Sequence, residues 1–172
     1  VVIGRGWDTS GAAYLDENAP PRTDSSYSLS RVLVENLARE FSYQRGLAIS
    51  CHRYCGFGYV PDNDLGPRLF CRTLPPADVA RAAILAATNY DLRGDVFLIA
   101  PRSPFTPVDM IQAMSNPKPV VDKYFPGACA ILEKRDMAME PTHFWPMCDT
   151  RKAKLILGWE PKLTFEKWLI NN

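Results

Sequence analysis

The sequence has almost no excess of charge of either sign, because 20 Lys and Arg stand against 19 Asp and Glu in 172 residues. With so little net charge, no general electrostatic attraction draws the chain to nucleic acid or to an anionic membrane. Long apolar runs are also missing, and none comes near the roughly 18–20 residues of a membrane span. These absences argue against nucleic-acid binding and membrane spanning, and the 47% of hydrophobic residues predict a soluble folded protein.

The sequence offers no pairing pattern for disulfides, because its cysteines are odd in number and scattered. They are Cys51, Cys55, Cys71, Cys129 and Cys148. This usage is typical of a reducing compartment, and we predict an intracellular location, in the cytoplasm or an organelle matrix. Cys51 and His52 lie near Cys55, but a strand would point Cys51 and His52 to opposite faces, so no metal site is predicted.

Proline is the residue type in excess, with 15 residues, about twice its average share of roughly 5%. The prolines separate the segments that can form regular structure. The strongest helix signal covers residues 27–45 and is followed by Gly46, which is placed to end a helix. Its large apolar residues recur every three or four positions, at Leu29, Val32, Leu33, Leu37 and Phe41. This spacing predicts an amphipathic helix that packs its apolar face on a sheet.

Two segments after this helix have the pattern of strands. The first is expected over residues 47–53, where apolar and polar residues alternate, and the second over the hydrophobic residues 95–100. An alanine-rich helix is expected between them, over residues 78–87, after Pro75 and Pro76. The alternation of helix and strand indicates an α/β fold.

The rest of the chain carries mainly signals for helix starts and ends. They are Thr106 with Pro107 and Asp109, Asp149 with a closing Gly158, and Thr164. Side chains of these types cap helix starts, and glycine ends helices in the left-handed conformation. The expected organisation is an α/β part over residues 1–100 and a mostly helical lobe over residues 101–172.

One pair of residues in the first predicted helix has a spacing that suits catalysis. Tyr27 and Arg31 are four positions apart, so a helix places the cation beside the phenol. A tyrosine with a pKa of about 10 is a poor base at neutral pH, and a neighbouring cation lowers that pKa. The same spacing is common in surface pairs on structural helices, so the pair alone leaves both interpretations open.

The surroundings of this pair resemble the extended short-chain dehydrogenase/reductase family, the NAD-dependent sugar-nucleotide epimerases and dehydratases. The signature of that family is Tyr, three residues and Lys, often with Ser before the Lys and Glu four residues after it. Tyr27, Ser30 and Glu35 match this signature, while Arg31 departs from it. Later landmarks follow in the family's order at residues 46–53, which end in an arginine, residues 78–82, which read Asp-Val-Ala-Arg-Ala, and residues 149–159, which end in Leu-Gly-Trp.

The resemblance implies a fold, ligands and site residues. The fold is the C-terminal part of a Rossmann-like parallel sheet with a small helical substrate lobe. NAD or NADP is the implied cofactor, and a nucleotide sugar is the implied substrate. Tyr27 and Arg31 are the implied catalytic and cofactor-binding residues, and Ser10 is the favoured hydroxyl for orienting the substrate oxygen. Relatives often dimerise through the tyrosine helix, which implies a homodimer, and a larger protein complex is the other partner considered.

Two departures from the family pattern bear on activity. Gly4, Gly6 and Gly11 lack the spacing of the glycine-rich loop that binds the cofactor pyrophosphate, so no such loop is found in the sequence. Arg31 supplies charge, but a planar guanidinium cannot easily copy a compact ammonium. We therefore expect an epimerase/dehydratase-like protein that is impaired or incomplete as this chain. The alternative is a degenerate active site on a subunit with a structural or assembly role.

Overall fold

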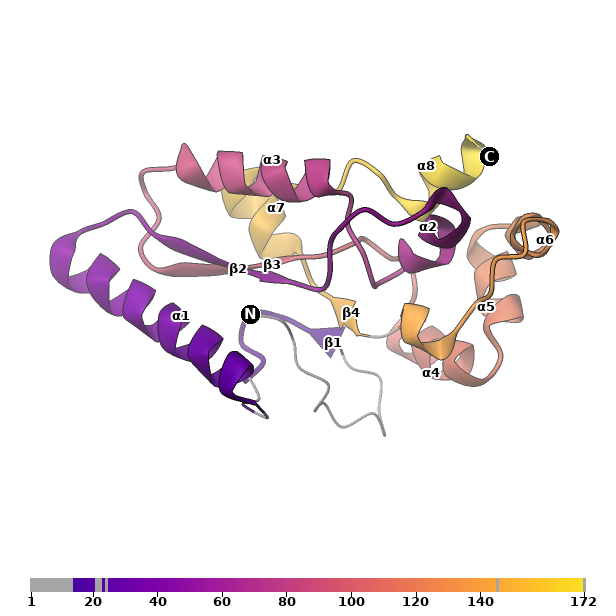
Figure 1. The fold of residues 1–172 in the computed structure, drawn as a ribbon, viewed down its shortest axis with the longest axis horizontal. Helices are drawn as coiled ribbons and strands as arrows, with labels where there is room; N and C mark the ends of the chain where they lie inside the picture. Colours follow the sequence, from indigo (N-terminus) through magenta and orange to yellow (C-terminus); the bar gives the residue numbers. More distant parts are fainter. Residues whose placement is uncertain (1–13, 21–22, 24, 145, 172) are drawn as a thin grey trace.

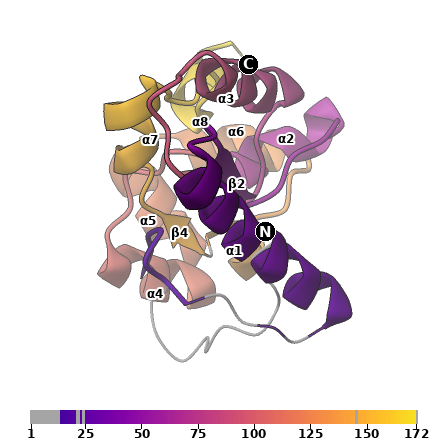
Figure 2. The same cartoon turned by 90° about the vertical axis from the view of Figure 1, so that its left-hand side faces the viewer.

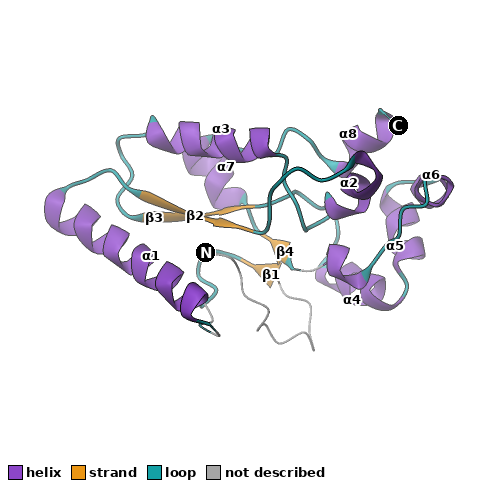
Figure 3. Ribbon diagram, in the orientation of Figure 1, coloured by secondary structure: helices purple, strands orange, loops and turns teal. Residues whose placement is uncertain are grey.

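The computed structural model describes residues 14–20, 23, 25–144 and 146–171. Within these residues the predicted α/β class is confirmed (Figure 3). Ser10, the favoured hydroxyl in the sequence, lies outside the described residues, and so do the glycines at positions 4, 6 and 11.

Two short parallel sheets carry the strands. In the larger sheet β2 (Ser50–Tyr54) pairs with β3 (Asp95–Ile99), so that Ser50 lies opposite Asp95 and Tyr54 opposite Ile99. In the smaller sheet β1 (Tyr14–Leu15) pairs with β4 (Met147–Cys148). The predicted strand over residues 95–100 is confirmed, whereas the one predicted from residue 47 begins only at Ser50. The two-residue strands are too short to show a period, so no sequence pattern predicts them.

Helices lie on both sides of the β2–β3 pair. α1 (Ser26–Arg45) is on one side, and α3 (Pro76–Ala87) and α7 (Arg151–Leu157) are on the other (Figures 1 and 2). The side of α3 and α7 holds one hydrophobic core, formed by Leu74, Ala82, Ala86, Leu92, Phe97, Ile99, Ala153, Leu157 and Trp159. This layering follows from the parallel pairing, because parallel strands are normally covered on both faces.

A group of short helices encloses a second core at the other end of the molecule (Figure 1). These helices are α2 (Asp62–Arg68), α4 (Pro107–Ser115), α5 (Pro117–Tyr124), α6 (Ala128–Lys134) and α8 (Phe165–Ile170), with a 3₁₀ turn at Pro141–Phe144. Aromatic rings fill this core, and the ring centre of Phe70 is 4.3 Å from that of Phe165 and 5.1 Å from that of Phe144. Such pairs stabilise a core beyond the area they bury.

Local signals set the ends of several helices as the sequence predicts. Thr106 and Asp109 form a reciprocal capping box at the start of α4. Gly46 ends α1 and Gly158 ends α7, each with a φ of 65°, a left-handed conformation that glycine adopts without strain. None of the helices in the described ranges combines the length and the apolar content that crossing a membrane requires.

Asp78 joins two of the segments that resemble family landmarks. Its buried carboxylate accepts hydrogen bonds from the backbone N–H groups of Lys162, at 2.9 Å, and Leu163, at 3.2 Å. The indole N–H of Trp159 donates to the backbone oxygen of Asp78 at 2.9 Å. The start of α3 and the Leu-Gly-Trp segment after α7 are therefore fastened together.

The orientation of α1 differs from the prediction. Its buried residues are polar, namely Ser28, Glu35 and Ser42, which recur every seven positions. Four of the five residues of the predicted buried face are about half exposed, with Leu29 at 47%, Leu33 at 52%, Leu37 at 56% and Phe41 at 51%, while Val32 is partly buried. At ~100° per residue these two stripes lie on nearly opposite sides of the helix. The prediction is wrong because α1 faces the sheet through the carboxylate of Glu35, which binds a buried arginine on β2.

Candidate functional site

Tyr27 and Arg31 lie on the first turns of α1. The N-terminus of the helix is capped, because the Ser25 hydroxyl accepts a hydrogen bond from the N–H of Ser28 at 3.1 Å. Tyr27 is 49% exposed, so its ring is not covered by packed side chains. The guanidinium carbon of Arg31 is 4.9 Å from the centre of the Tyr27 ring. The cation therefore stacks on the aromatic face, a contact worth roughly 0.5–1 kcal/mol at an exposed site.

A cavity of about 410 Å³ opens beside this pair. It is lined by Tyr27 and Arg31 from α1 and by His52, Tyr54, Cys55, Gly56 and Phe57 from the carboxyl end of β2 and the turn after it. Ligands of α/β proteins bind in crevices at the carboxyl ends of parallel strands. The ring centres of Tyr54 and Phe57 are 5.0 Å apart, so one wall of the cavity is aromatic. The space suits a flat ring placed next to a phenol and a cation.

Ser50, His52 and Tyr54 form a row of polar side chains on β2, of which His52 and Tyr54 line the cavity. The Nδ1 atom of His52 lies 3.1 Å from the Tyr54 hydroxyl, and its Nε2 atom lies 3.3 Å from the Ser50 hydroxyl. Burial lowers the pKa of His52 and raises the pKa of Tyr54, so both groups are neutral at physiological pH. Nothing in the family motif points to this row. The signal that finds it is the alternation of side chains along a strand, which places the three residues on one side.

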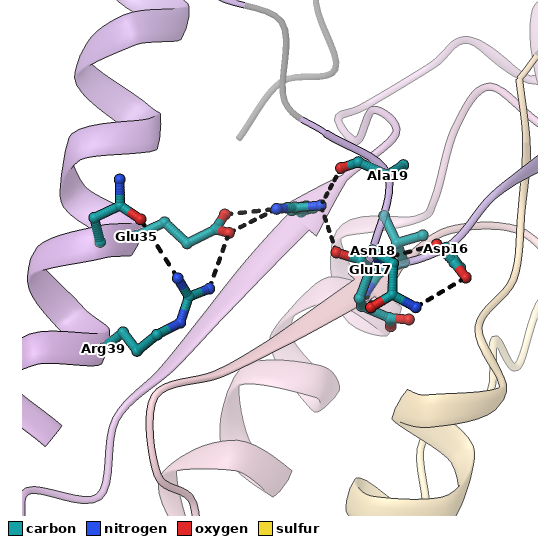
Figure 4. Close-up of polar contacts among 9 residues, drawn as sticks. Asp16, Glu17, Asn18, Ala19, Glu35 and Arg39 are labelled. Atoms are coloured by element: carbon teal, nitrogen blue, oxygen red, sulfur yellow. Dashed lines mark hydrogen bonds and ion pairs between the residues drawn. The ribbon is translucent and has the colours of Figure 1, made fainter. Parts of the chain in front are cut away.

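Glu35 and Arg53, which do not line the cavity, form a buried ion pair between α1 and β2 (Figure 4). Nη2 of Arg53 donates to Oε1 of Glu35 at 2.6 Å, and Nε donates to Oε2 at 3.1 Å. Nη1 of Arg53 donates to the backbone oxygens of Glu17, at 3.1 Å, and Ala19, at 3.2 Å. Oε1 of Glu17 in turn accepts the N–H of Leu98 on β3 at 2.9 Å. The pair thus holds α1, β2, β3 and the loop at residues 16–19 in fixed positions.

Other residues considered from the sequence have backbone or core roles. The Ser30 hydroxyl donates to the backbone oxygen of Tyr27 at 2.7 Å. Burial raises the pKa of the Cys55 thiol to about 12, so this cysteine of the cavity wall stays protonated and unreactive. Within the part of the chain that the structure describes, no three His, Cys, Asp or Glu residues are arranged to hold a metal ion.

The cavity fits only one end of a dinucleotide cofactor. Its aromatic wall, the phenol of Tyr27 and the guanidinium of Arg31 fit a nicotinamide ring and its ribose hydroxyls. No helix among the described residues begins at a loop with the three closely spaced glycines that let a backbone approach a pyrophosphate. These residues therefore provide groups for the reacting ring and no glycine-rich loop for the phosphates.

Solved structures share the fold of this chain, whereas no protein-family model and no curated protein sequence matches it. UDP-N-acetylglucosamine 4-epimerase from Bacillus cereus has 18% identity and a TM-score of 0.60, over 99% of this chain and 58% of that one. UDP-glucuronic acid 4-epimerase from Bacillus cereus, in complex with UDP-glucuronic acid and NAD, has 18% identity and a TM-score of 0.57, over 98% and 56%. A mutated uronate dehydrogenase has 19% identity and a TM-score of 0.57, over 92% and 42%.

The chain spans about half the length of these solved proteins. At such identities the likeness establishes the fold alone. It confirms the resemblance to the extended short-chain dehydrogenase/reductase fold that the Tyr27 motif and the later landmarks predict.

Proposed function

We propose that this chain is the C-terminal part of an NAD(P)-dependent epimerase/dehydratase-like protein that acts on a nucleotide sugar. The observation that carries the proposal is the placement of Tyr27 and Arg31 on one wall of a 410 Å³ cavity at the carboxyl end of β2. The shared fold with nucleotide-sugar epimerases supports it, because the cavity lies where parallel sheets bind ligands.

The chain's own residues have distinct roles in this proposal. The Tyr27 hydroxyl exchanges a proton with a sugar hydroxyl, and Arg31 stabilises the phenolate by its charge. Ser10 orients the substrate oxygen, as the resemblance implies. The aromatic wall at Tyr54 and Phe57 excludes water from one side of the reacting ring. When bound, the nicotinamide supplies hydride exchange with the sugar carbon.

Arg31 is the reason to expect impaired chemistry. Its guanidinium lies against the ring face of Tyr27 and is planar, extended and always charged. A lysine ammonium at this position would be a compact charge with freely turning donors that reach both the phenol oxygen and a ribose hydroxyl. We therefore propose that Arg31 still stabilises the phenolate of Tyr27 by its charge, but that it positions the phenol and the ribose less well than a lysine would.

Cofactor binding by the purified chain tests the proposal directly. We expect weak NADH binding, seen as a small saturable fluorescence change on titration, because these residues contact the nicotinamide end and supply no glycine-rich loop. We expect Arg31→Lys to raise any epimerase or dehydratase turnover and Tyr27→Phe to abolish it. Arg45→Lys, in the last turn of the same helix, is the matched control and should leave turnover unchanged. Equal turnover in the Tyr27→Phe variant and the unaltered chain would remove Tyr27 from the mechanism.

A structural role is the second candidate, and the orientation of α1 favours it. Leu29, Leu33, Leu37 and Phe41 form an apolar face that points away from the β2 side of the helix. An exposed apolar face of this kind is typical of surfaces that another protein chain covers. A homodimer formed through α1 is the assembly that we propose for this face.

A further inference from the structure

The turn after β2 carries an aromatic ring that is open to the cavity beside Tyr27. Phe57 lines this cavity and is 56% exposed. Its ring centre is 5.0 Å from that of Tyr54, and the planes of the two rings meet at 64°. The aromatic rings of the core are different in this respect, since Phe70 and Phe165 are 1% and 2% exposed. Phe57 therefore has ring surface that a ligand in the cavity can contact.

The segment that carries Phe57 is anchored to the chain just before α3. The backbone N–H of Leu74 donates to the backbone oxygen of Gly56 at 3.0 Å, and Phe57 forms a parallel bridge with Leu74. Leu74 is fully buried in the core on the side of α3 and α7. The backbone of Phe57 is therefore held in place by a segment of the core.

Gly56 permits this anchoring because it has no side chain. A Cβ atom at Gly56 would lie 2.6 Å from the backbone oxygen of Arg72, which is too close for two atoms that are not bonded. Gly56 is not among the residues with a positive φ, so other residue types could adopt its backbone conformation. Glycine is required here by the close approach of two backbone segments. A larger residue would push the turn with Phe57 away from Leu74.

The other aromatic rings that line the cavity already have polar partners. The guanidinium carbon of Arg31 is 4.9 Å from the centre of the Tyr27 ring. The hydroxyl of Tyr54 lies 3.1 Å from Nδ1 of His52. Phe57 has no polar atom in its side chain, and its exposed fraction of 56% exceeds the 49% of Tyr27. Its contribution to a ligand is therefore an apolar contact with the flat ring.

We propose that Phe57 is a specificity-determining residue of this cavity, whose ring stacks on a planar ring of the ligand, and that Gly56 is the residue that positions it. This inference rests on the proposed function, in which the planar ring is the nicotinamide. Contacts between aromatic rings favour a planar group beyond the apolar area that it buries. A saturated ring of the same size should therefore bind less well.

Two neutral amides of similar size separate ring stacking from simple apolar burial. Nicotinamide is planar, whereas cyclohexanecarboxamide is puckered and more apolar, so burial alone favours the second probe. We expect the whole chain to bind nicotinamide about fivefold more tightly, measured from changes in NMR chemical shift on titration. Phe57→Leu keeps an apolar side chain but removes the ring, so it should lower this affinity ratio to about one or below. Phe57→Tyr keeps the ring and should retain the ratio.

Gly56→Ala tests the positioning of Phe57. We expect it to lower the same affinity ratio, at a temperature at which circular dichroism shows the variant folded, because the Cβ atom displaces the turn. Gly66→Ala, on α2, is the matched control, since a Cβ atom there would lie 2.7 Å from the ring of Trp168. It should lower the Tm by overpacking and leave the ratio unchanged, because neither Gly66 nor Trp168 lines the cavity.

The outcomes distinguish this inference from the proposed function. If neither probe binds, the cavity is not a nicotinamide site and both are wrong. If nicotinamide binds no better than cyclohexanecarboxamide, or if Phe57→Leu keeps the ratio, the role of Phe57 is overturned and the nicotinamide site stands. If Gly56→Ala keeps the ratio of the unaltered chain, Gly56 does not position Phe57.

Discussion

The side chain of Arg53, on β2, joins α1 and the loop at residues 16–19. Both it and Glu35 are buried, at 7% and 5% exposure. Moving two charges out of water costs as much as their attraction returns, so the pair as a whole adds little stability. Once the pair is buried, however, each charge depends on the other, because no water reaches it. The pair therefore specifies how α1 faces the sheet, which explains why the polar side of the helix points inward.

Replacing Glu35 by Gln should destabilise the protein strongly. The change leaves the guanidinium of Arg53 buried without its counter-charge, and we expect a loss of about 3–5 kcal/mol in the free energy of unfolding. Urea unfolding followed by circular dichroism measures this loss. Glu40→Gln, on an exposed position of the same helix, should change the unfolding free energy by less than about 0.5 kcal/mol. Similar losses in the two variants would contradict the role given to the Glu35 carboxylate.

At the scale of helices and strands, the sequence predicts what local chemistry determines. The ends of α1 and α7 at Gly46 and Gly158 and the start of α4 at Thr106 follow the prediction, whereas Thr150 and not the predicted Asp149 is the N-cap of α7. The buried face of α1 depends on Arg53, which is 18 positions from Glu35, so no local period reveals it. The β1–β4 pair likewise joins segments that are far apart in the sequence, whereas the row from Ser50 to Tyr54 follows from the alternation of side chains along β2.

The carboxylate of Asp109 links α4 to α5, in addition to the apolar residues that the two helices share in the core. It accepts hydrogen bonds from Nζ of Lys123 at 2.8 Å and from the hydroxyl of Tyr124 at 2.6 Å. It also accepts the hydroxyl of Thr106 at 2.6 Å in the capping box. These hydrogen bonds hold the pKa of Asp109 well below its usual range. The bond from Lys123 has the largest effect, followed by those from the hydroxyl groups of Thr106 and Tyr124. The folded state therefore favours the ionised form more than the unfolded state does.

This pKa shift makes the α4–α5 contact sensitive to acid. Because the pKa of Asp109 is lower in the folded state, its contribution is complete above the ordinary carboxyl pKa of about 4 and is lost as the pH falls below it. We expect Asp109→Asn to lower the Tm at pH 7 and the Tm difference from the unaltered chain to shrink between about pH 5 and pH 2. Asp91→Asn, in an exposed turn, should show no such convergence. A Tm difference for Asp109→Asn that is constant with pH would contradict this linkage.

At the scale of the whole molecule, the two sides of the β2–β3 pair differ in how much apolar surface they leave exposed in the described structure. α3 and α7 bury their apolar residues on the sheet, whereas α1 leaves Leu33, Leu37 and Phe41 about half exposed. β3 is the only strand paired with β2 in the described residues. A two-stranded parallel pair whose outer edges are both unpaired is normally completed by further strands or by another chain. These features point to assembly through the α1 side.

Association through this face should be measurable and reversible. We expect the chain to sediment as a dimer at micromolar concentration and the double variant Leu33→Glu and Leu37→Glu to sediment as a monomer, because charge on an apolar interface opposes association. The double variant Leu155→Glu and Ile170→Glu changes exposed apolar residues on other helices and is the control. A monomeric unaltered chain would show that α1 is not a self-association surface under these conditions.

The hydrogen bonds of Arg53 also affect how stably the loop at residues 16–19 is held. The guanidinium of Arg53 donates hydrogen bonds to the backbone carbonyls of residues 17 and 19 and to Glu35 in the middle of α1. The carboxylate of Glu17 accepts a hydrogen bond from the backbone N–H of Leu98. Because these bonds link the loop, α1 and the two strands, we expect the linked segments to open together. We therefore expect the loop at residues 16–19 to resist cleavage by a protease for as long as the β2–β3 pair stays folded.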